Sequence, residues 1–225
     1  MNIVSLNSKV DLKDAVRHAS DVLRAGGVVL YPTDTLYGLG ADALSDEAVA
    51  KVQRIKGRNE KKPIHAIVAD LVMAEKYAVA NDDARLLVHT FWPACAKHSA
   101  AGRPGPLTLI LKKKPHVNAG IARDIDTFGV RTSDNLFCLA LAREFGRPYT
   151  TTSANKADLE PQRSVEAILS QLGETSADID LIIDAGELPR CLPSTVVDVR
   201  PGSLAIIREG AIPAPLIWDC LRAEL

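Results

Sequence analysis

Apolar residues recur at helical spacing in the first part of the chain. They are Leu12, Ala15, Val16, Ala19, Val22 and Leu23. This spacing places them on one face of an α-helix, which Asp11 can cap and which Gly26 and Gly27 would end. The pattern predicts a first helix between Asp11 and Gly26.

A second helical pattern lies further along the chain, between Ser45 as the expected N-cap and Gly57 as the expected end. Its apolar stripe is formed by Val49, Val52 and Ile55. That stripe leaves Lys51, Arg54 and Lys56 on the side expected to lie nearer solvent.

Short apolar and β-branched runs alternate with the helical patterns. The run 28–31 suits a strand covered on both faces, Pro32 would end it, and the following PTDTLYGLG segment is expected to begin a loop. Further strands are predicted at residues 64–68, 107–111, 128–131, 149–152, 181–184, 195–199 and 204–208, and further helices near 71–78, 83–90, 135–145, 165–172 and 214–222. This alternation predicts an α/β or α+β sheet protein.

Composition narrows the class of protein. With 225 residues and 47% hydrophobic content the chain can bury one sizeable core, so a single domain over 1–225 is expected. The balance of 27 basic and 28 acidic residues gives no sign of a nucleic-acid coat or a membrane-surface protein. The N-terminus lacks the basic and apolar regions of a signal peptide, and no apolar run approaches bilayer length, so a cytoplasmic setting without membrane contact is expected.

The cysteines indicate neither a disulfide framework nor a zinc site. Cys95, Cys138, Cys191 and Cys220 are widely scattered and form no CxxC pair. We expect reduced and mostly packed thiols.

Basic residues concentrate in one stretch, 51–62, which holds six basic residues against one acid. Such a cluster could bind an anion. The plain alternative is a solvated helix C-terminus, where the helix dipole favours cations.

Two polar segments follow predicted strands. Thr33, Asp34 and Thr35 follow the first, and the series from Thr150 to Asn155 follows another. Loops at strand ends commonly bind ligands in open α/β sheets, and hydroxyl and amide groups can hold phosphate or carboxylate oxygens. A threonine-rich β segment without any ligand is the alternative.

An arginine ends the apolar strand near the C-terminus. Arg208 follows two isoleucines, and Ser194 precedes the strand before it. The guanidinium fork can grip phosphate or carboxylate in a bidentate manner. The alternative is a structural ion pair of Arg208 with Glu209 or Asp198.

Several familiar catalytic motifs are absent from the sequence. There is no GxxxxGK[ST], GxGxxG, HExxH or GxSxG pattern, and the histidines have no metal-binding spacing. A P-loop ATPase, a dinucleotide-binding dehydrogenase, a zincin and an α/β-hydrolase are therefore unsupported, and no metal ligands are predicted.

Seven motifs in order carry a family resemblance. They are GGVVLYPTDTLYGLG, RIKGRNEKKP, GPLTLILKK, GVR, TTSAN, PSTVVDV and IIREGAI. Together they resemble the YrdC/Sua5 family over about residues 26–212, in its single-domain form. The resemblance implies one twisted mixed sheet, flanked by helices, around a concave and positively lined pocket.

The resemblance also implies an activity. Members of this family join L-threonine, bicarbonate and ATP into threonylcarbamoyl-AMP and pyrophosphate, as nucleotidyltransferases serving the N6-threonylcarbamoyladenosine modification of tRNA. It implies Mg²⁺ accompanying the ATP, and downstream tRNA threonylcarbamoyl-transfer proteins as partners.

Particular residues match the family's site. The L-threonine-binding set would be Thr35, Arg131, Thr151 and Ser194. The ATP-binding set would be Arg58, Lys62, Thr127, Ser153, Asn155 and Arg208. Lys56 and Arg58 would act in catalysis. The sequence offers no nucleophile, so positioning and charge stabilisation would carry the reaction.

The chain departs from the family pattern in three loops. Residues 94–104 look like an insertion, expected to be a surface excursion rather than a lid. The residues after Arg131 and after the SAN motif also differ from the usual ones.

Two alternatives stay open at this point. One is a non-catalytic module with weak RNA binding, against which the 4% aromatic content weighs. The other is a paralogue with different ATP-dependent chemistry.

Overall fold

The computed structural model describes residues 2–6, 11–57, 63–92 and 106–222. Its strands are β1 (Asn2–Ser5), β2 (Val29–Pro32), β3 (Tyr37–Gly40), β4 (His65–Ile67), β5 (Ala78–Val79), β6 (Leu107–Lys113), β7 (Thr127–Arg131), β8 (Tyr149–Ser153), β9 (Leu181–Asp184), β10 (Thr195–Asp198) and β11 (Ala205–Arg208). Its α-helices are α1 (Leu12–Arg24), α2 (Asp46–Lys56), α3 (Leu71–Ala74), α4 (Asp82–Phe91), α5 (Leu136–Phe145), α6 (Val165–Leu172) and α7 (Ala214–Arg222). Two 3₁₀ turns, η1 (Gly120–Ala122) and η2 (Gly173–Asp178), complete the described elements.

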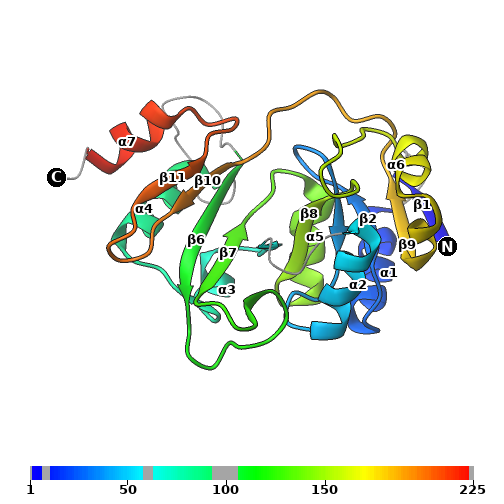
Figure 1. Cartoon of the computed structure of the whole chain (residues 1–225), viewed down its shortest axis with the longest axis horizontal. Coiled ribbons are helices and arrows are strands. Elements are labelled where there is room, and N and C mark those ends of the chain that lie inside the picture. Colours follow the sequence, from blue (N-terminus) through cyan, green and yellow to red (C-terminus); the bar gives the residue numbers. More distant parts are fainter. Residues whose placement is uncertain (1, 7–10, 58–62, 93–105, 223–225) are drawn as a thin grey trace.

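One mixed sheet organises the molecule (Figure 1). In the described part of the chain its strands follow the order β1-β9-β2-β3-β8-β4-β7-β6-β10-β11, with β5 paired to β6. Strands β4 and β7 are parallel, whereas β4 and β8 are antiparallel. The predicted α/β class and the mixed, helix-flanked sheet are confirmed.

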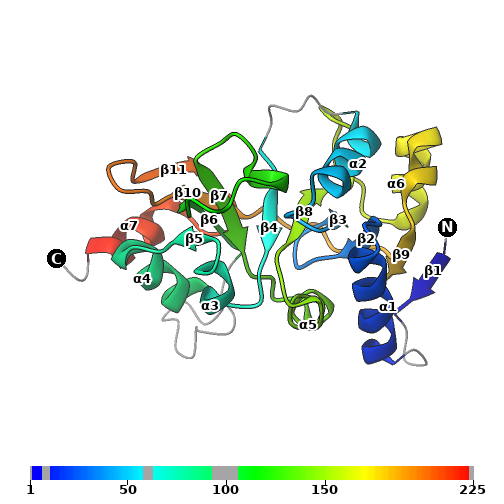
Figure 2. The same ribbon diagram turned by 90° about the horizontal axis from the view of Figure 1, so that it is seen from below.

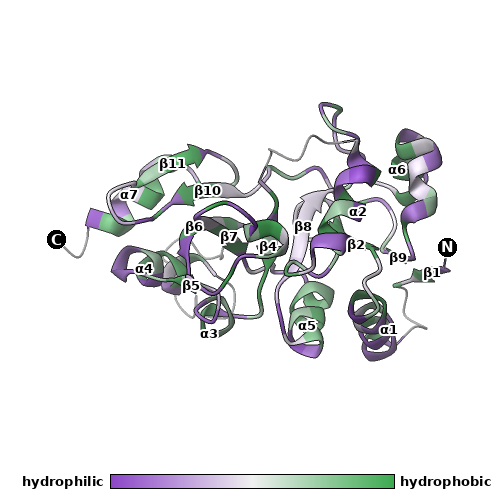
Figure 3. Ribbon diagram, turned by 60° about the horizontal axis from the view of Figure 1, so that its bottom comes forward, coloured by the Kyte–Doolittle hydropathy of each residue, from purple (hydrophilic) through white to green (hydrophobic). Residues whose placement is uncertain are grey.

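Helices flank the sheet and bury their apolar stripes. Helices α1, α3, α4 and α5 lie along one side of the strands in Figure 2. Helix α1 packs on α5, and α4 packs on α7. Figure 3 shows the hydrophilic outer surface of α1, while its apolar residues contribute to the core. Among the described residues no helix is both long enough and apolar enough to cross a bilayer.

Helix ends follow the predicted caps closely. The Asp11 carboxylate accepts from the amide of Lys13, and the Ser45 hydroxyl accepts from the amide of Ala48. Gly57 ends α2 in the left-handed conformation, at φ 58°, which glycine adopts without steric cost. Local side-chain chemistry therefore explains where these helices start and where α2 stops.

The prediction of a loop after Pro32 was wrong, because Tyr37–Gly40 forms strand β3. It pairs antiparallel with β2, with Tyr37 opposite Pro32. The Tyr31 ring covers the glycines of β3, and a Cβ on Gly40 would lie 2.8 Å from that ring. A strand whose alternate residues are glycine carries little apolar signal, which is why its sequence was interpreted as loop.

Two other elements also differ from the prediction. Strand β1 was not expected, and it pairs with β9 at the end of the described strand order. The helix expected over 71–78 ends at Ala74, and the short strand β5 follows it. A two-residue strand is too short to show period-two alternation.

Candidate active site

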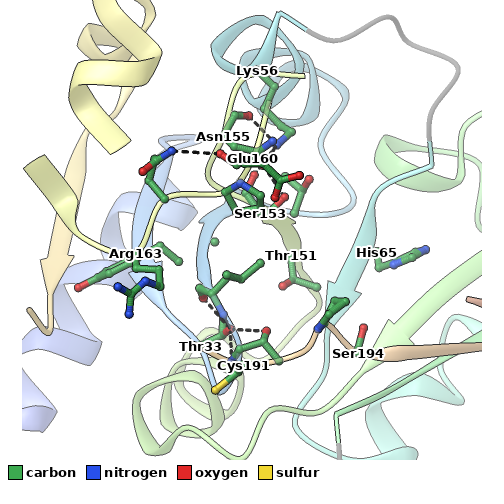
Figure 4. Close-up of a pocket in the computed structure, with 18 of the residues that line it drawn as sticks. Thr33, Lys56, His65, Thr151, Ser153, Asn155, Glu160, Arg163, Cys191 and Ser194 are labelled. Atoms are coloured by element: carbon green, nitrogen blue, oxygen red, sulfur yellow. Dashed lines mark hydrogen bonds between the residues drawn. The ribbon is translucent and has the colours of Figure 1, made fainter. Parts of the chain in front are cut away.

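A cavity of about 950 Å³ opens between the two halves of the sheet. Strands β3, β4, β6, β7 and β8, the end of α2, and the segments around 155–164 and 187–194 supply its lining. In Figure 4, Lys56, Ser153 and Asn155 gather at one end of the pocket, away from Thr33 and Cys191. The connection from β9 to β10 runs from one half of the sheet to the other (Figure 1).

A tight turn between β2 and β3 presents Thr35 to the cavity. The Thr33 hydroxyl donates to the carbonyl of Leu36 at 2.7 Å and accepts from the amides of Thr35 and Leu36, each at 3.1 Å. Thr33 is therefore occupied in holding the turn. The Thr35 hydroxyl lies 3.1 Å from that of Thr33 and keeps further hydrogen-bonding capacity toward the cavity.

Arg131 ends β7 as a buried cation beside a carboxylate. Its Nη2 donates to both oxygens of Asp34, at 2.5 and 2.7 Å, and its Nε donates to the carbonyl of Thr132. The Ser133 hydroxyl donates to Asp34 Oδ1 at 2.6 Å. Nη1 donates no hydrogen bond to the described part of the chain. It is therefore available to a ligand in the cavity that Arg131 lines.

Arg208, Ser194 and Thr108 form a second polar group, which contains no carboxylate. Arg208 Nη2 donates to the carbonyl and the hydroxyl of Ser194, at 2.8 and 3.0 Å. The Ser194 and Thr108 hydroxyls lie 2.9 Å apart. Burial, with a smaller contribution from the charge of Arg131, lowers the pKa of Arg208.

The alternative ion pairs of Arg208 do not form. The Glu209 carboxylate instead accepts from the amide of Ala214, and Asp198 pairs with Arg200. Gly210 lets the backbone approach the Ser194 segment closely, because a Cβ there would lie 2.2 Å from the carbonyl of Pro193.

Lys56 is buried, which corrects the prediction that it faces solvent. Its ammonium donates to the carbonyl of Ser153, to the carbonyl of Asn155 at 2.8 Å and to Asn155 Oδ1 at 3.2 Å. The residues after β8 cover the end of α2, where the amide of Ala157 donates to the carbonyl of Lys56. Helical periodicity could not foresee this cover, because it comes from a segment about one hundred residues away.

The cavity collects most of the residues predicted for the site. Lining residues from the predicted threonine, ATP and catalytic sets are Thr35, Lys56, Arg131, Thr151, Ser153, Asn155, Ser194 and Arg208. Arg58 and Lys62, together with the insertion at 94–104, lie outside the described residues. Eight predicted residues, from several separate segments of the chain, thus line one cavity.

Thr127 is the exception among the described predictions. It begins β7, whereas Arg131 ends that strand, and Thr127 pairs with Lys112 while Arg131 pairs with Thr108. Four residues of extended strand span roughly 13 Å. Thr127 therefore does not line this cavity, and its role in ATP binding stays a prediction.

Sequence reasoning missed several lining residues. They are Thr108, His65, Asp158, Glu160, Gln162, Arg163, Glu187, Arg190 and Cys191. Arg163 donates to the carbonyl of Leu188 and pairs with Glu187, which connects two of the missed segments. The missed residues at 158–163 and 187–191 lie in irregular, polar segments, so no periodicity marks them.

One of the missed residues, His65, packs against a glycine of the GVR motif. A Cβ on Gly129 would lie 2.4 Å from the ring of His65, so the GVR motif needs glycine to leave space for that imidazole. Period-two alternation alone would not reveal this cross-strand packing.

The thiols divide into different environments. Cys138 is packed as expected, and burial raises its pKa to about 12. Cys191 instead is exposed and lines the cavity, so it is not one of the packed thiols. Cys95 lies outside the described residues.

The acidic lining does not form a protein-built metal cage. Among the described residues no group of three or more His, Cys, Asp or Glu side chains is placed to hold a metal ion. Asp158 and Glu160 nevertheless line the cavity as carboxylates. This donor set fits an ion carried mainly by phosphate oxygens of a ligand.

Comparison with known proteins identifies relatives of the whole described fold. The family model Sua5_yciO_yrdC, described as telomere recombination, matches residues 21–210. A protein of Methanocaldococcus jannaschii is 35% identical over 98% of this chain and 97% of its own. Threonylcarbamoyl-AMP synthase of Mus musculus is 36% identical over 88% of this chain and 67% of its own.

A solved structure is similar as well. Pyrococcus abyssi Sua5, complexed with L-threonine, superimposes with a TM-score of 0.85 at 29% identity over 99% of this chain. The chain spans 61% of the length of that protein.

Proposed function

The chain belongs to the Sua5/YciO/YrdC family, and on this premise we propose that it is a threonylcarbamoyl-AMP synthase. It makes threonylcarbamoyl-AMP and pyrophosphate from L-threonine, bicarbonate and ATP, and its product serves the threonylcarbamoyladenosine modification of tRNA. One observation of the structure supports this activity above all. Although the chain has a net charge of −1, three basic residues, Lys56, Arg131 and Arg208, line one polar cavity.

The reaction requires such a cavity, because it brings several anions together. The threonine amine takes up bicarbonate with loss of water, and the resulting N-carboxylate attacks the α-phosphate of ATP while pyrophosphate leaves. Cations and hydroxyl donors offset the repulsion between these groups. As a nucleotidyl transfer, this step needs no enzyme nucleophile.

Threonine binds at the Arg131 side of the cavity. The Nη1 group of Arg131 donates to its carboxylate, and the hydroxyls of Thr35, Thr151 and Ser194 hold its amine and hydroxyl. Three of these residues are buried in the described structure, so their hydrogen bonds with the substrate would form away from bulk water.

ATP binds between Lys56 and Arg208. Arg208 carries a guanidinium without a carboxylate partner in the described chain, which suits a polyanion. Ser153 and Asn155 hold the Lys56 ammonium and contribute polar groups to the same wall. Arg58 and Lys62 complete the phosphate-binding set by family resemblance, and Arg58 assists catalysis with Lys56.

Mg²⁺ would enter with the nucleotide rather than occupy a resident site. Asp158 and Glu160 line the cavity as carboxylates and would contact it there, and the phosphates would supply its other ligands. When bound, the ion neutralises part of the phosphate charge. The protein's own cations orient the remaining phosphate oxygens.

The decisive experiment is incubation with ATP, L-threonine and labelled bicarbonate. We expect a labelled adenylate, and pyrophosphate release that requires both threonine and bicarbonate. Full pyrophosphate release with either one omitted would contradict the proposal and indicate a simple pyrophosphohydrolase. RNA binding that falls steeply with salt, without any nucleotide binding, would instead favour the RNA-binding alternative.

A further inference from the structure

Asp34 is a charged residue beside the site that the proposed chemistry does not use. Its side chain is 14% exposed, and it stands behind Arg131 rather than in the cavity lining. Both of its oxygens accept from Arg131 Nη2, and Oδ1 also accepts from the Ser133 hydroxyl. The carboxylate is thus held from two sides.

These contacts determine which donors of Arg131 reach the cavity. A guanidinium has five N–H donors in a rigid fork. Asp34 occupies Nη2, and the carbonyl of Thr132 occupies Nε, which leaves Nη1 for a ligand. A bound carboxylate would therefore meet a donor whose direction is already set.

The same contact joins two substrate-binding segments. Asp34 belongs to the turn that carries Thr35, and Arg131 lies 97 residues further along the chain. Thr33 fixes the inside of that turn, and the ion pair fixes the turn to the end of β7. Movement of Asp34 would displace Thr35 and Arg131 relative to each other.

The carboxylate of Asp34 does not help Arg131 to attract an anion. A negative charge beside Arg131 weakens its pull on any incoming carboxylate. Arg208 in the same cavity has no such neighbour among the described residues. What Asp34 can contribute is a fixed geometry, and a misplacement of about 1 Å in a site can cost about 100-fold in rate.

We propose that Asp34 is a positioning residue that aims Arg131 Nη1 and the Thr35 turn at the carboxylate end of L-threonine. This inference rests on the proposed function. It requires that Asp34 act on threonine binding through Arg131 and leave the nucleotide part of the cavity unchanged.

The test compares threonine and ATP in the full-length Asp34→Asn and Asp34→Ala variants, by KM and by direct titration. We expect the KM for threonine to rise at least about tenfold in Asp34→Ala and less in Asp34→Asn, which keeps one acceptor. The KM for ATP should stay near the parental value. Ser133→Ala, which removes one support of Asp34, should shift threonine binding in the same direction by a smaller factor.

A matched control is Asp198→Asn. Asp198 is a buried carboxylate paired with Arg200 at 2.7 Å, and neither residue lines the cavity. This variant should lower the melting temperature without changing the KM for threonine. It separates the loss of any buried ion pair from the loss of this one.

Each outcome decides the inference. Parental threonine binding in folded Asp34→Asn, or an equal rise in the KM for threonine and ATP, would show that Asp34 only stabilises the fold. If Asp34→Ala does not fold, Asp34→Asn and Ser133→Ala give the answer. A parent protein that binds no threonine would overturn the proposed function itself, whereas parental binding retained in the variants overturns this inference alone.

Discussion

Two arginines of the cavity are held in opposite ways. Arg131, at the end of β7, gives Nη2 to the carboxylate of Asp34. Within the described part of the chain, Arg208, at the end of β11, donates only to the neutral oxygens of Ser194. Both side chains line the cavity, so the difference lies in the acceptor that each guanidinium contacts, a carboxylate for Arg131 and neutral oxygens for Arg208.

The difference indicates two kinds of ligand. A guanidinium paired with a carboxylate has little net charge to offer and suits one carboxylate received in a defined geometry. A guanidinium bound only to neutral oxygens keeps its full charge, and burial strengthens its attraction for phosphate. The lowered pKa of Arg208, caused mainly by burial, reflects the cost of holding that uncompensated charge.

The largest expected effect is the loss of stability in Arg131→Met. This change leaves the Asp34 carboxylate without its partner, and breaking a buried pair typically costs about 3–5 kcal/mol. We expect about 3 kcal/mol in chemical denaturation, at the low end of that range, because the side chain of Asp34 keeps 14% exposure. Arg208→Met should lose far less. Equal losses in the two variants would remove the distinction between the arginines.

A double variant tests the cause of that loss. Asp34→Asn combined with Arg131→Met removes both charges, so much of the lost stability should return, while threonine binding should not. If the double variant is as unstable as Arg131→Met, the loss comes from packing of the arginine rather than from the unpaired carboxylate.

The next effect concerns nucleotide binding in Arg208→Ala. Losing a charge-assisted phosphate contact should cost on the order of 1.5–3 kcal/mol, or about 10- to 150-fold in the KM for ATP. The melting temperature should change little. Arg208→Lys keeps the charge but loses the guanidinium fork, so its KM for ATP should lie between those of the parent and Arg208→Ala. A variant that melts early yet binds ATP normally when folded would assign Arg208 a structural role.

A smaller effect is expected in Thr108→Val, which probes the link between the two arginines. Thr108 pairs across the strands with Arg131, and its hydroxyl contacts that of Ser194. Removing this neutral hydrogen bond should cost about 0.5–1.5 kcal/mol. We expect the KM for threonine to rise by a few-fold and the KM for ATP to stay constant. If only the KM for ATP rises, Ser194 would instead belong to the ATP-binding residues.

The smallest effect should come from an exposed ion pair, Asp46 with Arg123, whose side chains are 43% and 51% exposed. The hydrogen bond from Arg123 lowers the pKa of Asp46 in the folded protein. Its stabilisation is therefore present at neutral pH and is lost as the pH falls through that lowered pKa. Melting temperatures of the parent and Arg123→Ala should converge in acid and in high salt. A gap that persists in both would contradict an electrostatic origin.

Sequence patterns predicted the regular elements well where their cause was local. Helix α1 begins after Asp11, α2 runs between Ser45 and Gly57, and α6 has the predicted bounds, because caps and apolar stripes lie within a few residues of each other. Strand β3 escaped prediction because glycines alternate along it and the Tyr31 ring from the neighbouring strand covers them.

The site was only partly predictable, for the same reason. Motif resemblance indicated Arg131, Ser194 and Arg208, which the fold brings to one cavity. It also indicated Thr127, which begins β7 and does not line that cavity, so its role in ATP binding stays a prediction. A motif records that residues occur in order, whereas the register and direction of a strand decide which of them reach the pocket.

The sequence by itself determined the α/β class, the bounds of α2 and α6 and the family, because each depends on residue types and spacings along the chain. Only the tertiary structure decided that Lys56 is enclosed by carbonyl oxygens and that Asp34 pairs with Arg131. The partners in both contacts come from segments about one hundred residues apart, joined by the pairing of distant strands. Charge and burial at a site depend on such neighbours, and local periodicity carries no information about them.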